Sequence, residues 1–166
     1  MTTVIDIIDA EDKYTANDIK SLLKDKGFSN FIEMPPSSNV ILETVNRITH
    51  STPLFSIKLL RFWGHGEAGM QCIAGKEYCI TSTDFKHLEP LAQYFAKDAL
   101  VEFHGCEVAS LNKANNGEDF IQKLANLWNV RIRASTVEQK NMVDRTDWVK
   151  PVFEARPNTS GIFRVL

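Results

Sequence analysis

Residues 55–63, Phe-Ser-Ile-Lys-Leu-Leu-Arg-Phe-Trp, are the most strand-like stretch of this sequence. They are largely apolar on both faces, which is typical of a parallel strand buried inside a sheet. The stretch leads directly into Gly64-His65-Gly66. A second apolar stretch, 99–103, leads in the same way into His104-Gly105-Cys106. We therefore expect two buried strands that each end in a glycine-flanked, chemically reactive side chain.

The rest of the chain alternates between predicted strands and predicted helices. We expect further strands at 4–8, 31–34 and 130–135, and helices at 15–27, 37–53, 85–97 and 117–128. The apolar face of the second helix is predicted to be Ile41, Leu42, Val45 and Ile48. A small hairpin at 70–73 and 77–80 and a C-terminal β-pair at 152–155 and 161–165 complete the pattern. Such alternation predicts one α/β domain over 1–166, with a mostly parallel central sheet flanked by helices on both faces.

Composition narrows the function classes. The chain has 166 residues, of which 43% are hydrophobic, and a net charge of −2. A net charge this close to zero does not indicate a nucleic-acid-binding surface. No apolar run is long enough to span a bilayer. Three cysteines without a secretory signal argue against a disulfide framework. We expect a cytoplasmic protein by default, with non-classical delivery or secretion as the alternative.

The two strand ends predict a reactive site. Ligands of open α/β sheets bind outside the carboxyl ends of the strands. If the two strands are neighbours, His65 and Cys106 share one crevice there. An imidazole can then take the thiol proton and later return it to a leaving group. The backbone N–H groups of Gly66 and Cys106 are the expected oxyanion donors.

The segments Gly64-His65-Gly66 and 103–109, Phe-His-Gly-Cys-Glu-Val-Ala, resemble the caspase-like cysteine peptidases, a group that includes caspases, legumains and gingipains. The chain is similar in more detail to an uncharacterised caspase-fold domain of bacterial surface or adhesin-like proteins. Gly117-Glu118-Asp119, Ala134-Ser135-Thr136 and Asp147-Trp148 follow in the order seen there. The resemblance implies a caspase-like fold, with His65 as general base and Cys106 as nucleophile. His104 departs from it, because an aromatic residue such as Tyr is usual at that position.

Weaker hypotheses about the site concern other residues. His104 is a possible alternative base or a residue that packs beneath the site. Glu138, Asp144 and Asp147 are a possible substrate pocket for a basic side chain, although solvated loop charges are the simpler interpretation. The histidine and cysteine spacings match no zinc pattern, so we expect neither a metal nor another cofactor.

The function expected from these residues is that of a cysteine endopeptidase with a protein or peptide substrate, acting through an acyl-enzyme. Such a protein could serve as a bacterial toxin or effector. Two alternatives remain open. One is a catalytically silent domain of the same fold that binds a protein partner. The other is a Cys–His acyl-transfer enzyme with a non-peptide substrate. The sequence gives no indication of oligomeric state.

Overall fold

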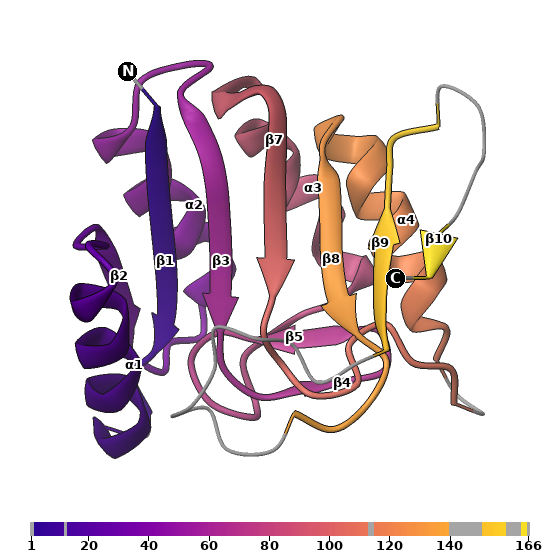
Figure 1. Ribbon diagram of the computed structural model, residues 1–166, viewed down its shortest axis with the longest axis horizontal. Coiled ribbons are helices and arrows are strands. Elements are labelled where there is room, and N and C mark those ends of the chain that lie inside the picture. The colour runs from indigo at the N-terminus through magenta and orange to yellow at the C-terminus, as the bar shows by residue number, and fades with distance from the viewer. Residues whose placement is uncertain (1, 12, 113–114, 140–150, 159–163, 166) are drawn as a thin grey trace.

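The computed structural model describes residues 2–11, 13–112, 115–139, 151–158 and 164–165. Its centre is a seven-stranded sheet of order β10-β9-β8-β7-β3-β1-β2 (Figure 1). The strands β1, β2, β3, β7 and β8 are mutually parallel, and β9 is antiparallel to both of its neighbours. The bounds are β1 (Thr3–Asp9), β2 (Phe31–Met34), β3 (Ile57–Trp63), β7 (Phe95–Phe103), β8 (Arg131–Ser135), β9 (Val152–Ala155) and β10 (Arg164–Val165).

Helices and a small second sheet surround these strands. The helices of the described residues are α1 (Lys13–Asp25), α2 (Val40–Ser51), α3 (Phe85–Leu88), α4 (Gly117–Trp128) and the 3-10 turns η1 (Ser82–Asp84) and η2 (Glu89–Tyr94). The second sheet is antiparallel and consists of β4 (Gly66–Glu67), β5 (Met70–Cys72) and β6 (Cys79–Ile80). It lies at the edge where β3 and β7 end (Figure 1).

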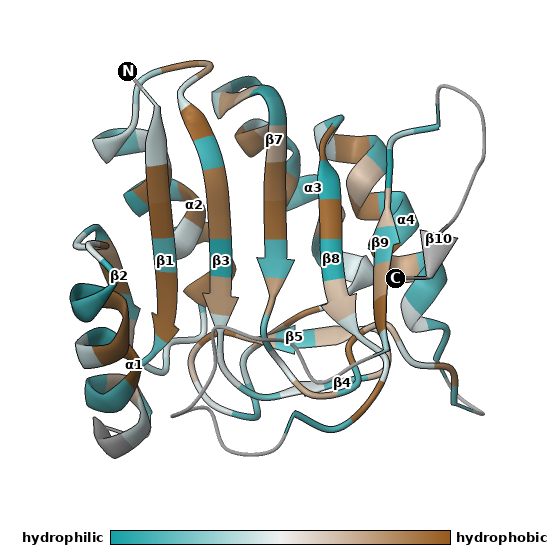
Figure 2. Ribbon diagram, viewed as in Figure 1, coloured by the Kyte–Doolittle hydropathy of each residue, from teal (hydrophilic) through white to brown (hydrophobic). Residues whose placement is uncertain are grey.

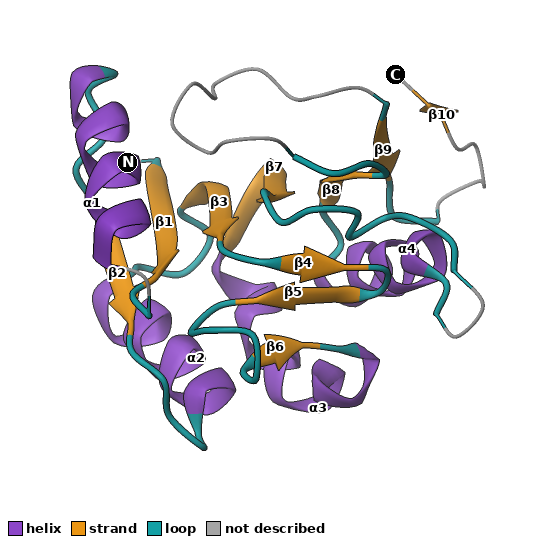
Figure 3. Cartoon of the chain, turned by 90° about the horizontal axis from the view of Figure 1, so that it is seen from below, coloured by secondary structure: helices purple, strands orange, loops and turns teal. Residues whose placement is uncertain are grey.

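The two faces of the central sheet are covered by different helices. On one, which we call the core face, Ile7, Phe62 and Phe103 are fully buried in the main cluster beneath α2, α3 and α4. On the other, the α1 face, Ile8 and Trp63 pack against α1. Figure 3 shows α1 on one side of the sheet and α2, α3 and α4 on the other. The predicted α/β architecture, with helices on both faces of a mostly parallel sheet, is confirmed.

A row of alternating charges crosses the α1 face. The strand register aligns Asp6 with Arg61, Arg61 with Glu102, Glu102 with Arg133, and Arg133 with Glu154. Figure 2 shows hydrophilic bands that interrupt the hydrophobic stretches of β1, β3, β7 and β8. Arg61 donates from Nε and Nη2 to the two carboxylate oxygens of Asp6 at 2.7 and 2.9 Å. This charge row lets ionic side chains occupy a buried sheet, because each carboxylate has a cation beside it.

The predicted helix over 85–97 is wrong in its second half. The α-helix stops at Leu88, η2 carries the chain to Tyr94, and β7 already begins at Phe95. Pro90, in the first turn of η2, is the physical reason. Its nitrogen has no hydrogen to donate to the carbonyl four residues earlier, and its ring obstructs that carbonyl.

Two smaller expectations are also corrected. Leu42 is 46% exposed and lies off the buried face of α2, which uses Val40, Thr44, Val45 and Ile48. Cys72 and Cys79 form a disulfide, although the cysteine count argued against one. The register of β5 and β6 explains the pairing, because it sets these two residues directly opposite each other in the hairpin.

Candidate functional site

The two glycine-flanked strand ends lie side by side. β3 and β7 are parallel neighbours, and Phe62 pairs with Phe103 at their carboxyl ends. The backbone N–H of His104 extends this pairing by donating to the Phe62 carbonyl at 2.9 Å. The segments that follow β3 and β7 both leave the sheet at the edge occupied by β4 and β5 (Figure 1). The sheet topology therefore delivers His65 and Cys106 to the same edge.

The two loops touch through their glycines. A Cβ atom added at Gly66 would lie 2.7 Å from the Cys106 carbonyl oxygen and 2.8 Å from Gly105 Cα. A Cβ added at Gly105 would lie 2.8 Å from Gly66 Cα and 2.9 Å from the His65 carbonyl oxygen. Real Cβ atoms do not approach backbone this closely. Glycine at both positions is thus the condition for the two strand ends to meet.

Gln71, at the centre of β5, binds both loops at once. Its amide nitrogen donates to the carbonyls of His65 at 3.1 Å and Cys72 at 2.8 Å. Its amide oxygen accepts from the backbone N–H of Gly105 at 2.9 Å. The residue is fully buried, so these bonds are shielded from competing water. Gln71 ties the His65 loop to the Cys106 loop, a role that the sequence analysis missed.

Cys106 is a half-buried free cysteine. Its Sγ accepts a hydrogen bond from the backbone N–H of Gln139 at 3.3 Å. The same segment is held by Glu107, whose backbone N–H donates to the Val137 carbonyl at 3.0 Å. Glu107 adopts a left-handed φ of 54°, which turns the chain sharply after the thiol. Cys106 thus lies between the tip of β7 and the segment that follows β8.

His65 has a fixed backbone and an exposed side chain. Its carbonyl accepts from the Cys72 N–H at 2.8 Å, in addition to the bond from Gln71. The main chain of His65 is therefore anchored at two points, while the imidazole faces the solvent-accessible side of the loop. The structure brings the backbones of the two predicted catalytic residues together.

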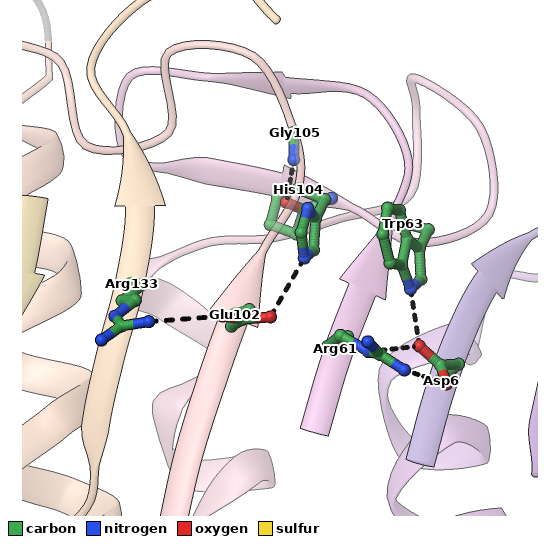
Figure 4. Close-up of polar contacts among 8 residues, drawn as sticks. Asp6, Arg61, Trp63, Glu102, His104, Gly105 and Arg133 are labelled. Carbon is green, nitrogen blue, oxygen red and sulfur yellow. Dashed lines mark hydrogen bonds and ion pairs between the residues drawn. The ribbon is translucent and has the colours of Figure 1, made fainter. Parts of the chain in front are cut away.

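His104 lies below these loops, on the α1 face (Figure 4). Its ring stacks on Trp63, with centroids 3.8 Å apart and planes 9° apart. Its Nε2 is 3.3 Å from Glu102 Oε2. Burial lowers the pKa of His104 below its usual value, against the opposing effect of Glu102. The ring is consequently neutral at neutral pH and donates to Glu102 from Nε2.

Glu102 connects His104 to the charge row. Burial alone would raise the pKa of this carboxyl group. The hydrogen bond from His104 and the positive charges of Arg61 and Arg133 oppose the effect of burial, and the pKa of Glu102 lies below its usual value. Arg133 Nη1 is 3.9 Å from Glu102 Oε1, as Figure 4 shows. Glu102 is therefore an anion that holds His104 in place from below.

Comparison with protein families gives one match. Residues 15–158 match the family described as "Domain of unknown function (DUF4347)". The chain belongs to this family. Searches of curated proteins and of solved structures found no match. Membership covers the whole of the site above and assigns it no activity.

A cavity of about 640 Å³ adjoins the candidate site of this DUF4347 domain. Three carboxylates line it: Glu67 follows the His65 loop, Glu107 follows Cys106, and Glu118 lies in the first turn of α4. Among the described residues that line it there is no lysine or arginine. Of the substrate pocket predicted from Glu138, Asp144 and Asp147, the structure describes Glu138 alone. Glu138 is exposed and does not line this cavity, and Asp144 and Asp147 lie outside the described residues.

Within the described ranges, no group of three or more His, Cys, Asp or Glu side chains is arranged to hold a metal ion. In the same part of the chain, the helices are too short or too polar to cross a lipid bilayer.

Proposed function

We propose that this protein is a cysteine endopeptidase in which His65 is the general base and Cys106 the nucleophile. The observation that carries the proposal is the joining of the two loops through Gly66, Gly105 and Gln71. A buried polar side chain that ties together two strand ends is costly unless every bond is made, so it marks a place where geometry matters. The caspase-like resemblance of the same two segments supports the assignment.

The chemistry follows from these two side chains. His65 removes the thiol proton of Cys106, and the thiolate attacks the carbonyl carbon of the scissile peptide bond. The backbone N–H groups of Gly66 and Cys106 stabilise the resulting oxyanion. Imidazolium then gives its proton to the leaving amine, which departs and leaves a thioester. Water, deprotonated by His65, hydrolyses the thioester and restores the thiol.

The hydrogen bond to the sulfur fits the role of Cys106. The backbone N–H of Gln139 donates to Sγ at 3.3 Å and the Gln139 carbonyl oxygen lies 3.6 Å from Sγ, so the main chain of one residue holds the sulfur in place. His104 has a different position, because its ring is stacked on Trp63 and bonded to Glu102 beneath the loops. These contacts favour His65 over His104 as the base in this proposal.

The adjacent cavity supports a preference for substrates with a basic side chain. Three carboxylates, those of Glu67, Glu107 and Glu118, line this cavity, and Glu107 directly follows Cys106 in the chain. A lysine or arginine side chain would fill the cavity and neutralise part of this charge. We propose that such a residue lies next to the cleaved bond.

A peptide-library digestion tests the proposed activity. Wild-type protein should cleave peptides that contain Lys or Arg, and Cys106→Ala should lower the rate by about 10³-fold or more. His65→Ala should lower it to a similar extent, because the two residues act as a unit. His50→Ala is the matched control, since His50 is exposed on α2 and bonds locally to the Asn46 carbonyl.

Three outcomes would separate this proposal from its rivals. Cleavage that survives in Cys106→Ala would remove the proposed nucleophile. A biological effect that persists in Cys106→Ala without cleavage would indicate a silent domain that binds a protein partner. Turnover of thioesters or other acyl compounds without turnover of any peptide would indicate a non-peptide acyl-transfer enzyme.

The cellular compartment is a separate question. The default expectation from the sequence is the cytoplasm, whereas disulfides such as Cys72–Cys79 persist mainly in oxidising compartments. Alkylation of the protein at the moment of cell lysis, followed by mass spectrometry, would report the state of these two cysteines. A reduced pair supports the cytoplasm, and an oxidised pair supports non-classical delivery or secretion.

A further inference from the structure

A second cavity lies at the opposite edge of the central sheet. Its volume is about 590 Å³. Residues from five places line it: the segment before β3, the starts of β7 and β8, the end of α4 and the residues after β9. Figure 1 shows the starts of β3, β7 and β8 at the edge away from β4 and β5. This cavity is therefore distinct from the candidate peptidase site.

The charge of this cavity is opposite to that of the first. Lys97, Arg131 and Arg156 line it, and Asp98 is the single carboxylate among the described residues that do so. Arg156 Nη2 is 3.1 Å from Glu154. Lys97 and Arg131 form no ion pair within 4 Å with a carboxylate of the described residues. Lys97 and Arg131 thus lack a salt-bridge partner among the described residues, although Asp98 lines the same cavity and the charge of Arg131 helps to lower the pKa of Glu154.

An exposed aromatic ring stands beside these cations. Phe55 lines the cavity and is 71% exposed. Its φ is 56°, a left-handed conformation that is rare for a residue with a bulky side chain. Its backbone N–H donates to the Gln93 carbonyl at 3.1 Å, which holds the residue in this conformation. The ring is therefore presented to solvent by a fixed backbone and has little packing of its own.

The left-handed residues of the described chain gather at this cavity. Of the four non-glycine residues with positive φ, Phe55, Asp98 and Asn129 line it. The left-handed conformation of Asn129 is explained by its position, because Asn129 caps the carboxyl end of α4. Phe55 has no such explanation, since glycine or asparagine would adopt its backbone more easily. An aromatic ring at this position is thus costly for folding and points to a use in binding.

We propose that this cavity binds a small anion that carries a flat ring, of which a nucleoside monophosphate is the simplest representative. Guanidinium and ammonium groups are the usual partners of phosphate oxygens, and Arg131 and Lys97 supply them. A flat ring stacks on an exposed aromatic side chain, and Phe55 supplies that surface. The volume of the cavity lies within the range of small-molecule sites.

Isothermal titration calorimetry with AMP, adenosine and inorganic phosphate tests this proposal on the full chain. AMP should bind saturably, and adenosine and phosphate should each bind at least about tenfold more weakly. Arg131→Gln should weaken AMP binding by about tenfold, which is the effect of losing one charge-assisted contact. Arg47→Gln is the matched control, because Arg47 is an exposed arginine on α2 that does not line this cavity.

Phe55→Gly separates binding from folding. The substitution removes the ring and relieves the left-handed backbone, so the Tm should stay unchanged or rise while AMP binding weakens. Absence of AMP binding to wild-type protein would overturn the proposal. Phosphate binding as tight as AMP binding, or AMP binding unchanged in Phe55→Gly, would overturn the role of the ring. AMP binding unchanged in Arg131→Gln would overturn the role of the cations.

Discussion

The two faces of the central sheet are built by alternate residues of the same strands. On the core face, β3 and β7 contribute Phe62 and Phe103, whose rings are 5.0 Å apart in the apolar interior. On the α1 face, the same strands contribute Arg61 and Glu102, two members of the charge row. The comparison teaches that the two faces have different roles. The core face mainly stabilises the fold, and the α1 face orients a series of polar groups that leads to His104 and the loops above it.

Phe103→Ala should cause the largest loss of stability. The side chain is fully buried, and its ring is tilted by 38° against that of Phe120, with centroids 6.1 Å apart. Truncation of such a ring costs about 3–5 kcal/mol through lost transfer free energy and the cavity left behind. Urea unfolding measures this directly. A loss below about 1 kcal/mol would contradict the view that the core face carries most of the stability.

Arg61→Met should cost about 3 kcal/mol on the α1 face, because it leaves the buried carboxylate of Asp6 without its cation. Asp6 also accepts from Trp63 Nε1 at 2.7 Å. The double variant Asp6→Asn with Arg61→Met keeps an amide oxygen for Trp63 and removes the charge. Its unfolding free energy should recover to within about 1 kcal/mol of wild type. A double variant as unstable as Arg61→Met would show that the ion pair itself contributes net stability.

Gln71→Met should cost about 2 kcal/mol, since the Gly105 N–H and the Cys72 carbonyl lose the Gln71 amide in the interior, while the His65 carbonyl keeps its bond from the Cys72 N–H. Met has a similar length and no amide. The important readout is the reactivity of the thiol, which should fall more than expected from the small change in stability if Gln71 positions the two loops. Gln122→Met is the control, because Gln122 bonds on the exposed surface of α4. Unchanged peptide cleavage in Gln71→Met would remove its positioning role.

His104→Tyr should give the smallest effect and change mainly the pH dependence of stability. Burial lowers the pKa of His104, so the unfolded chain binds a proton more readily than the folded one. His104 therefore contributes stability that is present above its unfolded pKa of about 6.5 and is lost as pH falls. Glu102 and Glu154 act at lower pH, because their lowered pKa values stabilise the fold above about 4.5.

Tyr keeps a ring to stack on Trp63 and does not titrate in this range. Urea unfolding at a series of pH values should show that the loss near pH 6 disappears in His104→Tyr, while the loss at lower pH remains. Identical pH profiles for the two proteins would mean that His104 is not buried in its neutral form.

The sequence was sufficient to predict the succession of strands and helices along the chain. It also predicted that the ends of the two buried strands could meet. It also contained the charge row in outline, because Asp6, Arg61 and Glu102 each interrupt an otherwise apolar strand. Their partners could not be assigned, since pairing depends on strand order and register, which are set by contacts far apart in the chain.

Gln71 was missed for the same reason. Nothing in 70–73 indicates that its amide reaches Gly105, which lies 34 positions away. Pro90, by contrast, was a local signal that should have shortened the predicted helix. The Cys72–Cys79 pair depends on hairpin register and is invisible in a count of cysteines.

The central claim is that His65 activates the thiol of Cys106, and alkylation by iodoacetamide tests it most directly. Because Cys72 and Cys79 are disulfide-bonded, Cys106 is the free thiol that such a reagent reports. At about pH 6, where an ordinary thiol is protonated and slow, wild-type protein should react at least about tenfold faster than His65→Ala. Equal rates in the two proteins would contradict the account.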